Sequence, residues 1–291
     1  MLPTKRADMR DIDWSRMAEP QKDGYDSEVT WIMATSGSSP GRVQPWVRKE
    51  RRPEDATICG DLVVARYIDA PDMSPPHFEF APLDHPHLAA AARYLTSWPE
   101  AYDQFTRLID TVHPCFNPVS VRRQSPSALI SCSHSYEEFF GAICVTVDHP
   151  LACAQAFVHE MAHQKLRALG VSNQRAIRLI TNDPERLYVS PIVSDRLRPM
   201  TAVLHAEYSF IYVTQLDLCM FDHEQDDLRR REILALISRN VPRVRSGRAT
   251  IADAIETDEA GAAFVEAFLD WTDRVIERGE ALLSNCRRHE G

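Results

Sequence analysis

A histidine pair with an adjacent glutamate is the clearest chemical pattern in the sequence, within the run AFVHEMAHQKL at residues 156–166. His159 and His163 are four positions apart, so on a helix they project from one face with Cβ atoms about 6 Å apart. That spacing allows two imidazoles to hold one metal ion. Glu160 lies about 100° around the helix from His159, where it can act as a base or support a ligand. The run therefore predicts a metal site.

The surroundings of the pair strengthen this prediction. The neighbouring residues are apolar: Phe157, Val158, Met161 and Ala162. A helix with this pattern is expected to be buried on nearly all sides, and burial of two histidines and a glutamate without partners costs free energy. A bound metal ion satisfies those groups, whereas histidines that merely decorate a surface need no apolar neighbours.

A third ligand is expected from a second apolar helix at about residues 200–220, in the run PMTAVLHAEYSFIY. His205 and Glu207 are the candidates. Residues two apart on a helix face different ways, so only one of them is expected to point at the metal. Both belong to apolar stripes of this helix, and the choice between them stays open on spacing alone.

Two kinds of chemistry fit such a site. With zinc, three protein ligands and one water form a tetrahedral hydrolytic centre, and Glu160 serves as the general base of a peptidase. With Fe(II), the same ligands leave three octahedral positions, two for a 2-oxo acid and one for dioxygen. Iron oxygenases usually combine two histidines with one carboxylate, which keeps Glu207 as an alternative to His205. The spacing does not separate the two metals.

Two longer runs carry a family resemblance. GAICVTVDHPLACAQAFVHEMAHQKL, followed by YVSPIVSDRLRPMTAVLHAEYSF, resembles the α-ketoglutarate-dependent HExxH-type peptide β-hydroxylases, which modify ribosomally made precursor peptides. The similarity covers about residues 128–215. Its core is the HExxH helix, the SP dipeptide after it and the RPxxxVLH run that opens the second helix. Together these elements are much more specific than HExxH alone.

The resemblance implies a set of roles. His159, His163 and His205 hold Fe(II), and Glu160 is a catalytic residue that supports the iron site or orients substrate or oxygen. Arg198 pairs with the distal carboxylate of 2-oxoglutarate, a task that suits a planar guanidinium. The reaction is hydroxylation of a side-chain β-carbon in the precursor peptide, with 2-oxoglutarate as cosubstrate.

Five other polar residues are weaker candidates. His85 and His87 have metal-like spacing, but in a proline-rich loop they are expected to be solvated. His134 can line the active cleft, although a satisfied loop histidine is the simpler interpretation. Arg122 and Arg123 are alternative anchors for 2-oxoglutarate or for an acidic peptide, with a solvated pair as the default.

Composition limits the class of protein. The formal net charge of the 291 residues is −9, which argues against a nucleic-acid partner because such binding needs a basic face. Seven scattered cysteines without a CxxC pair are expected to be reduced thiols in the cytoplasm. No secretory signal or membrane span is expected. The oligomeric state is not predicted.

The pattern of elements predicts an α+β fold that is predominantly α-helical with a small β-sheet, in which the HExxH helix packs on the second ligand-bearing helix. Residues 1–55, rich in Pro, Gly, Ser and charge, are expected to form a loosely ordered N-terminal extension or one that is wrapped on the main body, and residues 56–291 a single metal-dependent catalytic domain. The expected elements are helices within 88–112 (split at 98–99), 150–169, 200–220, 227–239 and 252–283, strands at 128–133 and 141–147, and a strand or buried helix at 57–68.

The sequence thus predicts an Fe(II)/2-oxoglutarate-dependent oxygenase that hydroxylates a precursor peptide. A zinc metallopeptidase with Glu160 as general base is the alternative. A third interpretation is a module that binds a leader peptide or another partner and carries an inactive metal centre.

Overall fold

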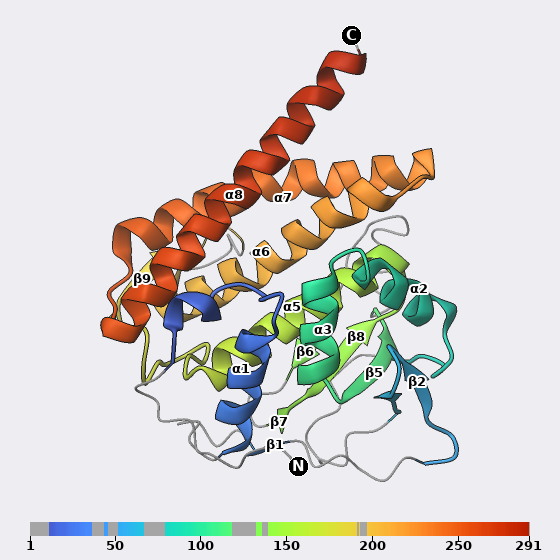
Figure 1. Cartoon of the computed structure of the whole chain (residues 1–291), viewed down its shortest axis with the longest axis horizontal. Helices are drawn as coiled ribbons and strands as arrows, with labels where there is room; N and C mark the ends of the chain where they lie inside the picture. Colours follow the sequence, from blue (N-terminus) through green and yellow to red (C-terminus); the bar gives the residue numbers. More distant parts are fainter. Residues whose placement is uncertain are drawn as a thin grey trace.

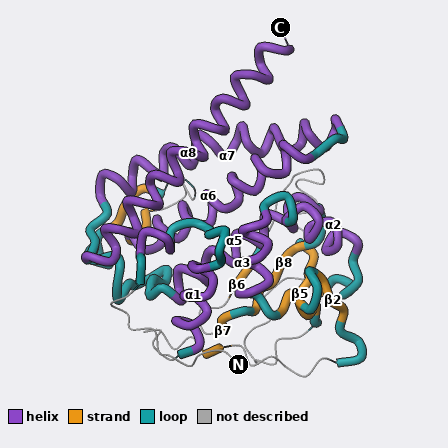
Figure 2. Tube along the Cα trace, in the orientation of Figure 1, coloured by secondary structure: helices purple, strands orange, loops and turns teal. Residues whose placement is uncertain are grey.

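A computed structural model of the protein describes residues 12–36, 44–45, 52–66, 79–117, 132–135, 139–190, 192 and 197–290. Helices dominate these ranges and accompany a small mixed sheet, which confirms the predicted fold class (Figure 2). The helices are η2 (Trp14–Met17), α1 (Tyr25–Thr35), α2 (Pro86–Leu95), α3 (Pro99–Leu108), α5 (Pro150–Ala168), α6 (Met200–His223), α7 (Asp227–Ala254) and α8 (Glu259–Glu290). The strands are β1 (Gln44–Pro45), β2 (Ala56–Ile58), β3 (Leu62–Val64), β4 (Glu79–Phe80), β5 (Thr111–Phe116), β6 (His134–Ser135), β7 (Phe139–Phe140), β8 (Ala142–Thr146), β9 (Leu187–Val189) and β10 (Leu197–Pro199).

The main sheet has the strand order β2-β3-β5-β8-β6, with β4 paired to β5. Strands β3, β5 and β8 run parallel, and Val112 of β5 is opposite Ile143 of β8. Every residue of β8 is buried, as expected for a strand that is covered on both faces. Helix α5 follows β8 after a short turn and packs against it, so the sheet fixes where the HExxH helix begins.

Helix α5 lies at the centre of the molecule, between the sheet and α6 (Figure 1). Its ends follow the sequence prediction. His149 is the N-cap, with its Nδ1 accepting a hydrogen bond from the Leu151 amide at 3.3 Å, and Pro150 occupies the first turn. Gly170 ends the helix with a φ of +100°, a conformation that favours glycine.

Helices α6, α7 and α8 form a layer over α5, and the last turns of α8 extend away from the rest (Figure 1). The predicted helix at 200–220 is α6. The first predicted tail helix is longer than expected, because α7 continues through Pro242 and Gly247 to Ala254. The second begins and ends later than expected, because the break between the helices lies at 255–258. Pro242 is exposed, where the solvent can satisfy the backbone carbonyl that loses its hydrogen bond.

The described N-terminal residues agree with an extension that packs on the main body. Residues 12–36 are not loosely ordered, because η2 and α1 contribute Met17 and Met33 to the hydrophobic core. Asp26 of α1 is fully buried and forms an ion pair with Lys165 of α5 at 2.6 Å. This long-range contact has no local signal in a segment rich in loop-forming residues. The remaining residues before 55 are described only at 44–45 and 52–54.

Three further expectations can be compared with the structure. The predicted helices within 88–112 are α2 and α3, split at Trp98 as expected, but Thr111 and Val112 begin strand β5 instead of ending a helix. The run 57–68 contains the hairpin of β2 and β3. Strand 141–147 is confirmed as β8, whereas residues 128–131 lie outside the described residues and β6 begins at His134. Within the described ranges, no helix combines the length and apolar character needed to cross a membrane.

Candidate metal centre

The exposed positions of α5 are its two motif histidines. All other residues of this helix are buried, whereas His159 and His163 are partly exposed. The His159 side chain is 31% exposed, and the neighbouring Glu160 is buried. The helix is therefore accessible from outside only where the sequence predicts metal ligands.

The two histidines are close enough to share an ion. Nε2 of His159 and Nε2 of His163 are 3.1 Å apart, with the rings nearly perpendicular. Two nitrogens that each bind one metal at about 2.1 Å lie about 3.0–3.4 Å apart at octahedral to tetrahedral angles. The pair fits this requirement. Glu160 lies on the same side, with its Oε1 3.9 Å from Nε2 of His159.

His205 approaches the pair from α6. Its Nε2 donates a hydrogen bond to the carbonyl oxygen of Val171 at 2.7 Å, so the neutral ring has its lone pair on Nδ1. That Nδ1 lies 2.9 Å from Nδ1 of His163. A metal-bound histidine usually donates its other N–H to a carbonyl or carboxylate, and the bond to Val171 has this form. The second helix therefore brings an imidazole lone pair to the cluster.

The three imidazoles form a chain with His163 in the middle. The sequence instead predicts three imidazoles that converge on one metal ion. His163 presents Nε2 to His159 but Nδ1 to His205. Among the residues described, no three histidine, cysteine, aspartate or glutamate side chains are arranged to hold a metal ion. The Cε1 atom of His163 separates its two nitrogens, and a half-turn of the ring exchanges Cε1 with Nε2. Such a turn places one nitrogen between both neighbours, so His205 as third ligand stays a prediction.

The imidazoles of the cluster are held neutral. Burial lowers the pKa of His205 to about 3 and the pKa of His159 below its usual value. Burial also lowers the pKa of His163 well below its usual range, and the two neighbouring imidazoles lower it further. Neutral rings keep the lone pairs that metal binding requires.

Arg167 is a charged neighbour that the sequence interpretation missed. It lies on α5 four residues after His163 and eight after His159, on the same stripe, and it is buried. Its Nη1 donates to the carbonyl oxygen of Ser135 at 3.2 Å and to the Ser135 hydroxyl at 2.9 Å. Its charge contributes to lowering the pKa of His205 and of both motif histidines. The i, i+4, i+8 spacing is the signal that could have identified it.

His134 lies close to this cluster on β6, next to Ser135. Burial lowers the pKa of His134, while the Glu160 carboxylate raises it and the Arg167 guanidinium lowers it. The adjacent Ser135 accepts hydrogen bonds from Arg167. That His134 lines the cleft stays a prediction.

Glu207 faces a different neighbour. The carboxylate lies against α7, where a Cβ atom at Gly247 would collide with its Oε2. Neither carboxylate oxygen has a hydrogen-bond partner in the described part of the chain, and burial raises the pKa of Glu207 well above its usual value. His205 instead contacts Val171 and His163. Tertiary packing thus separates the two ligand candidates that the sequence left open.

Arg198, the predicted anchor for 2-oxoglutarate, lies on β10, opposite Tyr188 of β9. It is half-buried, and its Nε has no hydrogen-bond partner. Arg198 is not among the charges that shift the pKa of His159 or His205, whereas Arg167 is. Its predicted role is untested by these contacts. The alternative anchors at 122–123 lie outside the described residues.

The other predicted histidines have structural roles. His85 caps α2, with its Nδ1 accepting from the His87 amide at 3.3 Å. Nδ1 of His87 lies 2.7 Å from the carbonyl oxygen of Val147. Both rings therefore make hydrogen bonds at the N-terminal end of α2, whereas the sequence predicts solvated side chains in a loop.

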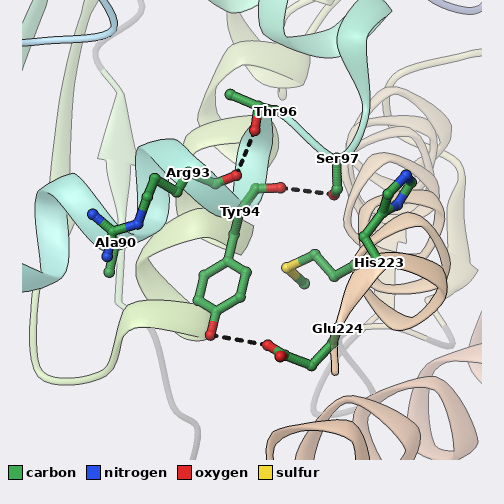
Figure 3. A pocket seen from close by; sticks show the side chains of 8 residues that line it. Ala90, Arg93, Tyr94, Thr96, Ser97, His223 and Glu224 are labelled. Atoms are coloured by element: carbon green, nitrogen blue, oxygen red, sulfur yellow. Dashed lines mark hydrogen bonds between the residues drawn. The ribbon is translucent and has the colours of Figure 1, made fainter. Parts of the chain in front are cut away.

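A cavity of about 330 Å³ lies at the other end of α6, beside the C-terminal end of α2 (Figure 3). His223, on its rim, is 18 residues after His205, a separation of about 27 Å along a helix. Several polar groups around the cavity bind one another: Tyr94 donates to Glu224 at 3.4 Å, and the Thr96 hydroxyl donates to a backbone carbonyl. This cavity is distinct from the histidine cluster.

Comparisons with known proteins give no assignment. No protein-family model matches the chain, and no curated protein matches it. The similarity to peptide β-hydroxylases therefore depends on the sequence motifs alone.

Proposed function

We propose that the protein is an Fe(II)/2-oxoglutarate-dependent oxygenase that hydroxylates a side-chain β-carbon of a ribosomally made precursor peptide. His159, His163 and His205 would hold the iron. One observation carries the proposal: ring nitrogens of His163 lie 3.1 Å from Nε2 of His159 and 2.9 Å from Nδ1 of His205, so two helices bring three neutral imidazoles together.

The charges of the proposed site are compatible with an anionic cosubstrate. The divalent metal ion and the Arg167 guanidinium are both positive, and the two carboxylates of 2-oxoglutarate could bind to them.

The donor set fits iron as well as other first-row metals, because neutral imidazole suits Fe, Zn, Cu and Ni. When bound, iron supplies the dioxygen chemistry that no side chain provides. The overall reaction consumes dioxygen and 2-oxoglutarate, releases carbon dioxide and succinate, and inserts the second oxygen atom into a C–H bond of the peptide.

The protein's own residues bind and orient the reactants. The Arg167 guanidinium can pair with the distal carboxylate of the cosubstrate, and its hydrogen bonds to Ser135 hold it in place. The bond from His205 to Val171 fixes the orientation of the imidazole. The partial exposure of His159 and His163 leaves one open side for the peptide, while the rest of α5 excludes water.

A cytoplasmic location belongs to this proposal. All seven cysteines of the chain are free thiols, and three of them are buried: Cys115, Cys144 and Cys153. Free thiols are typical of a reducing compartment, where Fe(II) also stays reduced.

Zinc peptidase activity is the second candidate, because one observation favours it. Glu160 Oε1 lies 3.9 Å from Nε2 of His159, on the side where a metal-bound water would be expected. A carboxylate in that position can accept a proton from the water, as in HExxH peptidases. The oxygenase proposal gives Glu160 a different task, orientation of substrate or oxygen.

Anaerobic reconstitution tests the two candidates. The protein is loaded separately with Fe(II) and Zn(II), and 2-oxoglutarate is added without dioxygen. We expect the iron form to develop the charge-transfer absorption of an Fe(II)–2-oxo acid complex, and His163→Asn to lack it. A precursor peptide should then gain one oxygen atom with matched succinate formation.

Other outcomes assign the alternatives. Peptide cleavage by the zinc form that is lost in Glu160→Gln and needs no dioxygen would establish the peptidase. Metal binding with neither activity would support a binding module. Arg167→Gln should raise the KM for 2-oxoglutarate at least about tenfold, since a charged hydrogen bond contributes about 1.5–3 kcal/mol. A larger effect in Arg198→Gln would return the anchor to the originally predicted arginine.

A further inference from the structure

The β9–β10 ribbon presents an apolar face to the outside. The strands pair antiparallel, with Leu197 opposite Val189 and Pro199 opposite Leu187. Leu187, Val189 and Leu197 are 51%, 64% and 55% exposed. Tyr188, between the first two, is buried, so side chains alternate between an inner face on α6 and an outer face. The outer face of such a ribbon is normally polar.

The exposed hydrophobic side chains are concentrated on the β9–β10 ribbon. Across the described ranges the large exposed hydrophobic side chains are Phe80, Ile177, Leu187, Val189, Leu197 and Leu228, and half of them belong to this ribbon. The ribbon has two strands, and no other described strand pairs with either of them. Open strand edges carry backbone N–H and C=O groups that can pair with an added chain.

A cation that has no counter-ion among the described residues lies on the same ribbon. Arg198 of β10 is half-buried, its Nε has no hydrogen-bond partner, and the structure gives it no ion pair within the described residues. The nearby Arg186 differs, since it pairs with Glu256 at 3.4 Å. An approaching carboxylate would therefore be complementary to Arg198 and not to Arg186.

The ribbon leads directly to the candidate metal centre. Strand β10 ends at Pro199, and α6 begins at the next residue. His205 is six residues further on, about 9 Å along the helix. A peptide that pairs with β10 would therefore lie near the histidine cluster. Figure 1 shows β9 at the end of the molecule where α8 begins.

We propose that an extended peptide segment adds as a strand to the open edge of β10, with an acidic side chain opposite Arg198 and an apolar side chain on each side of it. The acidic group lies on the inner face beside the guanidinium, and the flanking groups extend the apolar outer face formed by Leu197 and Val189. The apolar–acidic–apolar triplet would be the recognition element. That this peptide is the substrate rests on the proposed function, whereas its binding does not.

Binding of short synthetic peptides to metal-free protein tests the docking separately from the chemistry. The probes are fluorescein-labelled peptides with a central Leu-Glu-Leu or Leu-Gln-Leu, followed by fluorescence anisotropy. We expect the Glu peptide to bind about tenfold more tightly than the Gln peptide, the range of a charge-assisted hydrogen bond. In Arg198→Gln this preference should disappear, and Arg198→Lys should retain part of it.

Surface variants test the apolar contribution. Leu197→Ser, on the strand that the peptide pairs with, should weaken both peptides several-fold, while Leu228→Ser, at an exposed leucine on α7, should leave binding unchanged. Methylation of peptide backbone nitrogens should also weaken binding if a strand is added.

Three results would overturn the proposal. One is equal affinity for the Glu and Gln peptides in the unaltered protein. Another is an Arg198→Gln variant that changes only the KM for 2-oxoglutarate. The third is self-association through the ribbon, seen as a concentration-dependent dimer that Val189→Ser converts to monomer. Loss of hydroxylation with intact peptide binding would instead contradict the proposed function and leave the docking site standing.

Discussion

Two polar clusters lie between α5 and its neighbours, and they are built in opposite ways. Lys165 is the centre of the first. Its Nζ donates to Asp26 at 2.6 Å and to the Tyr212 hydroxyl at 3.3 Å, and Gln104 donates to the same carboxylate. Both ends of the ion pair are fully buried. The charges of this cluster are matched inside the protein.

The second cluster is centred on His163, two residues earlier on the same helix. His159 and His163 are partly exposed, His205 is buried, and ring nitrogens of neighbouring histidines lie 2.9 and 3.1 Å apart. The nearby Arg167 adds a positive charge where a metal cation is expected. The neutral rings of this cluster keep the lone pairs that can bind a metal ion.

One helix thus carries polar residues of two kinds: those around Lys165 stabilise the fold, and those around His163 can bind a metal ion. A buried pair with all hydrogen bonds formed fixes how α1 docks, and removal of one partner leaves an uncompensated charge. Neutral imidazoles with one open side contribute little to folding but can bind a metal and an anion. Substitutions in the two clusters should therefore have different consequences.

The largest effect on stability is expected at the first cluster, around Lys165. Lys165→Met leaves Asp26 buried without its cation and should lower the free energy of unfolding by about 3–5 kcal/mol. Urea denaturation followed by circular dichroism measures the change. The exposed pair of Arg186 and Glu256 provides the control, since Arg186→Gln should cost less than about 1 kcal/mol.

A double variant keeps this prediction testable if the single one fails to fold. Asp26→Asn combined with Lys165→Met removes both charges and should be less destabilised than the sum of the single changes. Additive effects, or a loss below about 1 kcal/mol for Lys165→Met alone, would contradict the assignment of a coupled buried pair.

The buried carboxyl group of Asp217 should make the free energy of unfolding depend on pH by about 3 kcal/mol. Asp217 accepts hydrogen bonds from Gln155 at 2.7 Å and Asn240 at 2.9 Å, yet burial raises its pKa from 3.8 to about 7. The folded state then binds the proton more tightly than the unfolded state. The stabilising contribution is complete below pH 3.8 and is lost as the pH rises through about 7.

The matching variant isolates this contribution. Asp217→Asn cannot ionise, so the difference in unfolding free energy between the protein and the variant should change by about 3 kcal/mol between pH 4 and 7.5. Thermal or urea unfolding across that range measures it. A difference that is constant with pH would show that Asp217 titrates normally.

The packing of Glu207 should give a smaller effect. Gly247→Ala places a Cβ against the Glu207 carboxylate and should destabilise the protein by about 1–3 kcal/mol. Glu207→Ala should relieve the clash, which a double-mutant cycle of unfolding free energies would detect. Retained metal binding in Glu207→Ala would confirm that this carboxylate is not a ligand, and its loss would reverse that conclusion.

The smallest effect on folding is expected at the second cluster, around His163. His163→Asn should change the stability of the metal-free protein by less than about 1 kcal/mol, because a partly exposed neutral ring is removed. Addition of metal should raise the Tm of the unaltered protein but not of this variant. His223→Asn, at an exposed histidine of α6, is the matched control. Equal metal-induced shifts in all three proteins would rule out a ligand role for His163.

Local patterns sufficed for much of this fold. The HxxxH spacing on an apolar run correctly placed His159 and His163 side by side on one helix, because the geometry of a helix fixes residues four apart. The predicted range 150–169 agrees with the ends of α5, where His149 and Pro150 begin the helix and Gly170 follows it, since caps and positive φ are properties of neighbouring residues. These features depend on interactions within a few residues of one another.

Only the tertiary structure decided which groups meet. It turned His205 toward α5 and Glu207 toward α7, buried Arg167 beside the imidazoles and drew Asp26 into the core. Residues on different faces of an apolar helix look alike in sequence, because the packing partner of each face is supplied by distant segments. The sequence determined that α5 carries a pair of potential ligands, and the packing of the other helices determined what surrounds them.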